Sequence, residues 1–201
     1  MNAPVAIPPP NDGLARIGAN SVLKLVPLLD DVLGETERNR LVLSTGLSEL
    51  PKHEGMMAET PAAALHQAIR ASHPTLAPAL TKRAGERTAE YIMEQRIPAA
   101  ALQVMLNLPP WLSAPLLASV IKKHAWTFAG SGTFSVRSKD PLVFALKDNP
   151  VVRGEHSTVP LCHWHSAVFQ RLFSTIVDSN LRCIETQCCA TGADSCIFEI
   201  R

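Results

Sequence analysis

The cysteines of this chain are concentrated near its C-terminal end. Four of the five fall within the last twenty of the 201 residues, and the fifth, Cys162, stands further upstream. An odd number of thiols gathered in one segment is unlike the spread pattern of a disulfide framework. This concentration constrains the fold more than any other feature, and it predicts metal binding in the C-terminal part of the chain.

Three of these thiols and one carboxylate have a spacing that suits a closed tetrahedral site. Cys188 and Cys196 flank a turn containing Gly192, so two neighbouring strands can bring both thiolates to one point. Glu185 lies three residues upstream of the turn, and Cys162 begins a predicted helix whose N-terminus favours a thiolate. Three sulfur ligands and one carboxylate form a closed site of the kind that holds structural zinc.

The strand that leads to this turn presents a geometric difficulty. Side chains alternate along a regular strand, so Glu185 and Cys188 would face opposite sides of the sheet. We therefore expect the strand to end or to bulge near residues 186–187. Cys183 is interpreted as a core thiol, Cys189 is an alternative ligand to Cys188, and ordinary buried thiols remain the alternative to a metal site.

Composition and charge exclude several classes of function. The net charge is +1 and the pI is about 7.7, so the chain lacks the basic surface of a nucleic-acid-binding protein. The apolar stretches 99–106 and 112–121 are shorter than the roughly 20 residues of a transmembrane helix. Residues 1–10 hold four prolines and no basic residue, unlike a signal peptide, so a cytoplasmic location is expected.

Hydrophobic periodicity changes from helical to strand-like along the chain. The pattern predicts a flexible Pro-rich leader over residues 1–12, a helical part over 13–107, and a mixed part over 108–201. Helices are expected at 21–33, 35–44, 62–72, 76–96, 98–106, 110–124 and 162–177. Strands are expected at 127–137, 142–146, 181–187 and 196–200. This order predicts an α+β fold in which helices pack on an antiparallel sheet.

The tail of the chain resembles a known family. Residues 184–200 read Ile-Glu-Thr-Gln-Cys-Cys-Ala-Thr-Gly-Ala-Asp-Ser-Cys-Ile-Phe-Glu-Ile, which, with Cys162 upstream, is similar to the 4-vinyl reductase domain. Related domains in phenol-sensing activators hold zinc through three Cys and one Glu, a pattern that selects Cys162, Glu185, Cys188 and Cys196. Residues 83–92 are similar to the family of the J protein of bacteriochlorophyll synthesis in purple phototrophs. The family fold is similar to the trafficking and nitric-oxide-signalling ligand-binding fold.

The resemblance implies a role in pigment synthesis but leaves three functions open. The first is a carrier or assembly factor that binds a magnesium tetrapyrrole and serves an enzyme such as the magnesium chelatase or the methyltransferase. The second is reduction of the 8-vinyl group of a divinyl protochlorophyllide or chlorophyllide with a partner's reductant, since residues 130–135 lack the third glycine of a dinucleotide fingerprint. The third is a sensor of a small apolar ligand. A homodimer and a position at the periphery of the photosynthetic membrane are compatible with each.

A tetrapyrrole needs an apolar pocket and an axial donor, and several residues are candidates for these roles. His165 shares a helical row with apolar residues, and His124 ends a predicted helix, where capping is the simpler explanation of an imidazole. A bland explanation exists for His165 as well, because a histidine on an apolar face is more often a core residue than a ligand. The aromatic candidates for the pocket are Trp111, Trp126, Phe128 and Trp164, which would otherwise fill the core.

Overall fold

A computed structural model describes residues 14–47, 49–52 and 55–201, and the expected leader at 1–12 lies outside them. The described helices are α1 Asn20–Leu23, α2 Val26–Leu33, α3 Glu35–Ser44, α4 Glu59–Ser72, α5 Ala77–Gln95, α6 Ala99–Asn107, α7 Pro110–Lys123, α8 Trp126–Ala129 and α9 His163–Ile176, with short 3₁₀ turns η1 Pro150–Val152 and η2 Cys189–Thr191. The strands are β1 Arg16–Gly18, β2 Met56–Ala58, β3 Thr133–Lys139, β4 Leu142–Lys147, β5 Cys183–Gln187 and β6 Ser195–Ile200.

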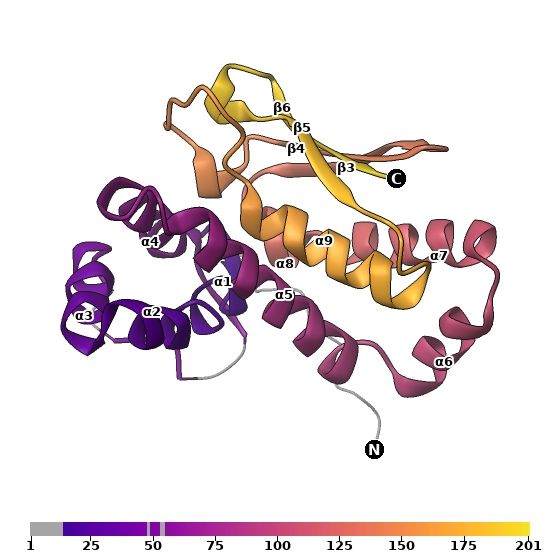
Figure 1. The fold of residues 1–201 in the computed structure, drawn as a ribbon, viewed down its shortest axis with the longest axis horizontal. Helices are drawn as coiled ribbons and strands as arrows, with labels where there is room; N and C mark the ends of the chain where they lie inside the picture. The colour runs from indigo at the N-terminus through magenta and orange to yellow at the C-terminus, as the bar shows by residue number, and fades with distance from the viewer. Residues whose placement is uncertain (1–13, 48, 53–54) are drawn as a thin grey trace.

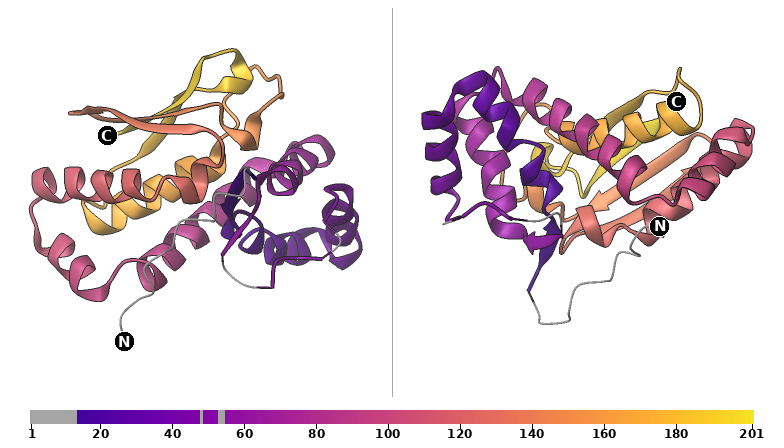
Figure 2. Two further views of the ribbon diagram at one scale, coloured as in Figure 1. Left: turned by 180° about the vertical axis from the view of Figure 1, so that it is seen from behind. Right: turned by 90° about the horizontal axis from the view of Figure 1, so that it is seen from below.

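The architecture is the predicted α+β arrangement. Strands β3, β4, β6 and β5 form, in that order, an antiparallel sheet, and β1 pairs with β2 in a separate two-stranded ladder. Helices α9 and α7 lie against one face of the four-stranded sheet, and α5 packs on α9 from the other side (Figure 1). Helices α2 to α4 gather at one end of the molecule and α6 and α7 at the other (Figure 2).

Aromatic rings fill the space between α9 and the sheet. All six phenylalanines of the chain belong to one network of ring contacts, with neighbouring ring centroids 5.1–6.0 Å apart. Most of these pairs meet edge to face, the arrangement that aromatic quadrupoles favour. The rings come from α8, β3, β4, α9 and β6, so this cluster fixes the helix layer on the sheet.

Two of the expected elements differ from the structure. The single helix expected at 21–33 is divided into α1 and α2, because Pro27 lacks an N–H group and its ring would clash with the carbonyl of Leu23. The strand expected at 127–137 begins only at Thr133, because residues 126–129 form α8 and Gly130 reverses the chain with a φ of +58°. The β1–β2 ladder is an addition to the expected elements, since strands of three residues carry too little periodicity to be recognised.

The histidine at the centre of α4 is fully buried. His66 Nε2 donates to the carbonyl oxygen of Ser21 at 3.0 Å, and its ring meets Trp164 edge to face. Burial, with a contribution from the charge of Arg70, lowers the pKa of His66 to about 3. The native protein therefore holds a neutral imidazole at this position.

We expect His66 to make stability depend on pH. Below pH 6.5 the unfolded chain binds a proton at this residue and the native chain does not, so stability falls as pH drops from 6.5 towards 3. At pH 5 the cost is about 2 kcal/mol relative to pH 7. Urea unfolding at pH 5 and pH 7 should show that His66→Gln removes this difference while the exposed His156→Gln keeps it. An unchanged pH difference in His66→Gln would contradict this assignment.

Candidate metal centre

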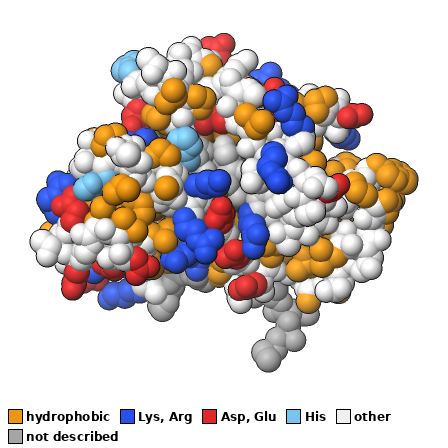
Figure 3. Space-filling model, in the orientation of Figure 1, with side chains coloured by type: hydrophobic (Ala, Val, Ile, Leu, Met, Phe, Trp, Pro, Cys, Tyr) orange, Lys and Arg blue, Asp and Glu red, His pale blue; other side chains and the backbone are white. Residues whose placement is uncertain are grey.

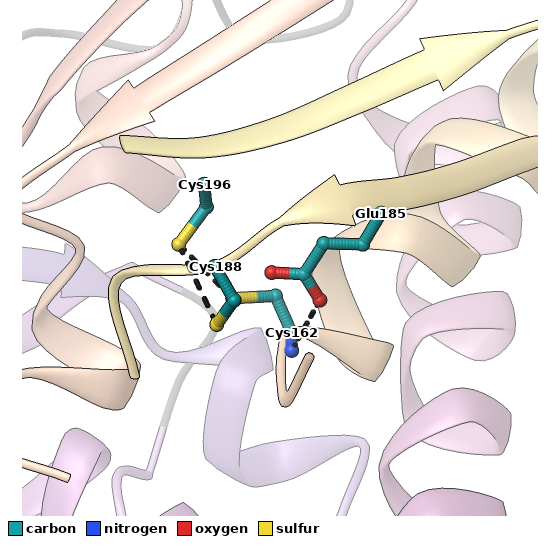
Figure 4. Close-up of side chains that lie close together, drawn as sticks. All are labelled: Cys162, Glu185, Cys188 and Cys196. Carbon is teal, nitrogen blue, oxygen red and sulfur yellow. Dashed lines mark hydrogen bonds between the residues drawn. The ribbon is translucent and has the colours of Figure 1, made fainter. Parts of the chain in front are cut away.

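Four side chains from three parts of the fold converge at the end of the sheet. Their ligand atoms, three sulfurs and a carboxylate oxygen of Cys162, Glu185, Cys188 and Cys196, all lie within 4.8 Å of one another (Figure 4). Cys162 is the residue that precedes α9, Glu185 belongs to β5, Cys188 follows β5, and Cys196 belongs to β6. The structure therefore brings together the four residues that the sequence singled out.

The strand irregularity that this convergence requires is present. The pairing of β5 with β6 shifts register between Glu185 and Gln187, so the expectation of a bulge near residues 186–187 is confirmed. The extra residue lets Glu185 and Cys188 reach the same point although strand side chains alternate. Gly192, with a φ of +92°, then ends the short η2 turn that leads the chain back towards Cys196.

The sulfur atoms have the separations of a tetrahedral site. The Sγ atom of Cys162 is 3.4 Å from that of Cys196 and 3.9 Å from that of Cys188, and the last two are 4.0 Å apart. A zinc ion with Zn–S bonds of about 2.3 Å holds tetrahedral sulfur ligands about 3.8 Å apart. All three thiols are free and far too distant for a disulfide.

The carboxylate of Glu185 occupies the fourth corner. Its Oε2 accepts a hydrogen bond of 2.8 Å from the backbone N–H of Cys162, while its buried Oε1 has no hydrogen-bond partner among the described residues. Figure 4 shows Oε1 on the side facing the cysteines. A buried oxygen without a partner is costly unless something binds it. A cation at the centre of the four ligands would satisfy it.

The protonation of the cluster is consistent with a site that needs a cation. Burial raises the pKa of Glu185 to about 8 and that of Cys162 well above its ordinary value. Hydrogen bonds from Cys162 and Cys196, and then from backbone N–H groups, lower the pKa of Cys188, so one thiolate forms first. Further negative charge in this space is unfavourable until a divalent cation compensates it, so metal binding releases protons and strengthens as pH rises.

A residue that the sequence analysis missed lies behind the sulfur atoms. Asn149 is fully buried, and its Nδ2 group lies 3.2 Å from the sulfur of Cys162 and 3.7 Å from that of Cys196. Its Oδ1 accepts from the N–H of Val151 and so fixes the amide. The backbone N–H of Cys189 adds a donor to the Cys196 sulfur at 3.4 Å. Such donors stabilise metal-bound thiolates.

The two remaining thiols lie outside the group of four. Cys183 is buried at the start of β5, as expected of a core residue, and burial raises its pKa to about 12. Cys189 is half-buried and contributes its backbone rather than its sulfur. Of the two alternatives that the sequence left open, the structure thus places Cys188 in the cluster.

The candidate ligand-pocket residues are only partly together. His165, Trp164 and Phe128 meet in the core, with ring centroids 4.8 Å apart for the first two and 6.2 Å for His165 and Phe128. Trp126 is half-buried on α8, and His124 ends α7 as its capping residue. Trp111 lies apart from them on α7 and is 73% exposed.

Comparison with known proteins gives a consistent family and fold. Residues 142–201, which contain all four clustered residues, match the family model of the 4-vinyl reductase domain. The bacteriochlorophyll synthase 23 kDa chain of Cereibacter sphaeroides is 46% identical over 92% of this chain and 90% of its own length. The protein of that name from Rhodobacter capsulatus is 41% identical over 96% and 90%.

Solved structures of H-NOX proteins share the fold. The Fe(II) unliganded form from K. algicida has a TM-score of 0.57 and 13% identity, and covers 92% of this chain and 96% of its own. The Fe(II)NO form from S. oneidensis has a TM-score of 0.54 and 11% identity, with 92% and 98% covered. At such identities the likeness is one of architecture, and it agrees with the fold expected from the sequence.

Removing one ligand should separate the cluster from the neighbouring core thiol. We expect Cys196→Ser to lose bound zinc, with affinity reduced by more than about 100-fold and a lower melting temperature, because metal binding contributes to folding. Cys183→Ser also changes a buried thiol and should retain zinc. Elemental analysis and chelator competition measure both effects. Equal zinc loss in the two variants would show that the ligands are assigned wrongly.

Changing the amide behind the sulfurs tests the hydrogen bonds to them. Asn149→Asp keeps the oxygen that accepts from Val151 but replaces the Nδ2 donor with an anion facing two thiolates. We expect zinc affinity to fall by about 10- to 100-fold. The exposed Asn180→Asp has the same change in charge and serves as the control. Equal zinc affinities in chelator competition would exclude a role for the Asn149 amide.

Proposed function

The chain belongs to the family of the bacteriochlorophyll synthase 23 kDa chains, and we propose that it serves bacteriochlorophyll biosynthesis by carrying a magnesium tetrapyrrole to a pathway enzyme. The observation that carries this proposal is the 41–46% identity over nine tenths of both relatives. In the same proposal, the cluster of three cysteines and Glu185 holds a structural zinc ion that ties α9 to the sheet. Four protein ligands leave zinc no open position for a substrate.

The buried aromatic region between α8, α9 and the sheet is the proposed place for the pigment. His165 is 1% exposed among Trp164, Phe128, Phe169 and Phe198. Burial lowers the pKa of His165 to about 4, so its imidazole is neutral at physiological pH, and its Nδ1 has no hydrogen-bond partner among the described residues. A neutral imidazole in an apolar setting is a suitable axial donor for a magnesium ion.

The pigment must displace part of this packing in order to bind. Phenylalanine rings occupy the region, and Phe128 on α8 packs against Phe134, Phe169 and His165. Helix α8 spans only residues 126–129 and is followed by Gly130, whose positive φ is unusual for other residues. We propose that α8 moves away and gives the macrocycle access to His165.

The glycine-containing segment after α8 favours a carrier over a reductase with its own nicotinamide site. The N–H and Oγ groups of Ser131 each donate to the Glu59 carboxylate at 2.6 Å, and Arg153 pairs with the same carboxylate at 3.1 Å. A segment that leads into β3 and encloses a buried carboxylate is a poor phosphate-binding loop. Vinyl reduction with a partner's reductant is therefore the alternative activity.

The remaining parts of the proposal concern partners and location. We propose the magnesium chelatase or the methyltransferase as recipient, a cytoplasmic location at the periphery of the photosynthetic membrane, and a homodimer as an accessible state. A sensor of a small apolar ligand is the further alternative that the fold permits. Among the described residues, no helix combines the length and the apolar character that crossing a bilayer requires.

Pigment titration tests the carrier function. The purified chain should shift the absorption spectrum of magnesium protoporphyrin or its monomethyl ester, and His165→Ala should weaken binding by at least about tenfold because the axial donor is lost. The exposed His156→Ala is the matched control, and thermal unfolding of each variant shows that it is folded. With divinyl pigment and NADPH or NADH alone, chromatography should find no monovinyl product.

Each contrary result leads to a different alternative. Turnover of divinyl pigment with nicotinamide cofactor alone would establish a self-sufficient reductase in place of the carrier. The absence of a spectral shift with both porphyrins would contradict tetrapyrrole binding and favour the sensor of a smaller ligand. Equal pigment binding by His165→Ala and His156→Ala would show that the pigment lies elsewhere.

A further inference from the structure

Helices α6 and α7 form a region without charge. No Asp, Glu, Lys or Arg occurs between Arg96 and Lys122, a segment that contains both helices and the Pro109–Pro110 junction between them. Met105 anchors α6 in the core, and Leu117 and Ile121 anchor α7. The opposite faces of both helices are exposed, although their side chains are largely apolar.

The exposed apolar residues of the described chain are concentrated on these two helices. Five of its eleven exposed large hydrophobic residues form this surface, which we call the α6–α7 patch: Val104, Leu106, Trp111, Leu112 and Leu116. Figure 3 shows hydrophobic side chains gathered at the edge of the molecule where α6 and α7 lie in Figure 1. Contiguous exposed apolar surface on a folded protein marks an interaction site more often than scattered residues do.

Basic residues border the patch. Lys122, Arg137 and Lys139 line, with Pro115, Ala118 and Ser119, a groove of about 410 Å³ between α7 and β3, and Lys123 is the last residue of α7. Within the part of the chain that the structure describes, none of these four cations is in a salt bridge. Asp140, after Lys139, is the one acid in the adjoining turn.

We propose that the α6–α7 patch docks the protein on the surface of an anionic phospholipid bilayer. Trp111 would lie at the interface, where indole rings are favoured, and the leucines beside it would reach the acyl boundary. The four cations would face the lipid headgroups. Helix α7 has 14 residues with Pro115 inside it, so it lies along the surface instead of crossing the bilayer.

The charges argue against a second copy of this chain as the occupant. A twofold contact through the same patch would place two sets of cations near one another, which disfavours association. An anionic lipid surface instead complements both the apolar residues and the cations. The inference deepens the peripheral membrane location included in the proposed function, and it names the surface responsible.

Vesicle sedimentation tests the inference with the full chain. We expect binding to vesicles of about 70% phosphatidylcholine and 30% phosphatidylglycerol that is at least about tenfold stronger than binding to phosphatidylcholine alone, and that weakens with added salt. Trp111→Ser should reduce the partition constant about tenfold. Leu43→Ser, at an exposed leucine of α3, should leave it unchanged.

Charge variants and quenching sharpen the test. Lys122→Gln with Lys139→Gln should weaken binding to the anionic vesicles, whereas the exposed pair Lys82→Gln with Lys147→Gln should not. Brominated lipids should quench tryptophan fluorescence in the wild type, and Trp111→Phe should lose most of this quenching. Trp126 and Trp164 provide the background in that variant.

Three outcomes would overturn the inference. They are no binding to anionic vesicles, equal vesicle binding by Trp111→Ser and the wild type, and dimerisation through the patch that Trp111→Ser abolishes without any lipid binding. Pigment titration in the absence of vesicles reports separately on the carrier function. A failure of membrane docking is therefore distinguishable from a failure of pigment binding.

Discussion

The convergence of three thiols and one carboxylate at the end of the sheet is the constraint on which the C-terminal half of the structure depends. Cys162 fixes the start of α9, Glu185 and Cys188 fix the bulged end of β5, and Cys196 fixes β6. Without a cation, four acidic groups within 4.8 Å would have to hold protons or repel one another. With a divalent cation, the same contacts become one crosslink between helix and sheet.

The rest of the core extends from that crosslink. Helix α9 places Phe169 and Phe173 on the sheet and Trp164 against His66 of α4, so the N-terminal helices are connected to the cluster through one packed layer. Glu59 at the start of α4 is held by Ser131 and Arg153, which connects the same helix to the segment before β3. A pigment that enters beside His165 would disturb this layer while the crosslink holds α9 in place.

Much of the candidate site could be predicted from the sequence because its signals are local. The spacing of Glu185, Cys188 and Cys196 contains the turn and demands the bulge that the structure shows. Asn149 could not be found in this way, since its approach to two sulfurs depends on contacts 13 and 47 residues distant. Helix α8 falls inside an expected strand because its aromatic and β-branched residues have strand propensity, which packing of Phe128 in the core overrides.

X-ray absorption at the zinc edge tests the central claim most directly, because it reports the ligand atoms themselves. The purified full chain carrying one equivalent of zinc should show three sulfur atoms at about 2.3 Å and one oxygen at about 2.0 Å. This is the ligand shell expected for Cys162, Cys188, Cys196 and Glu185. A shell of nitrogen and oxygen without sulfur would contradict the account.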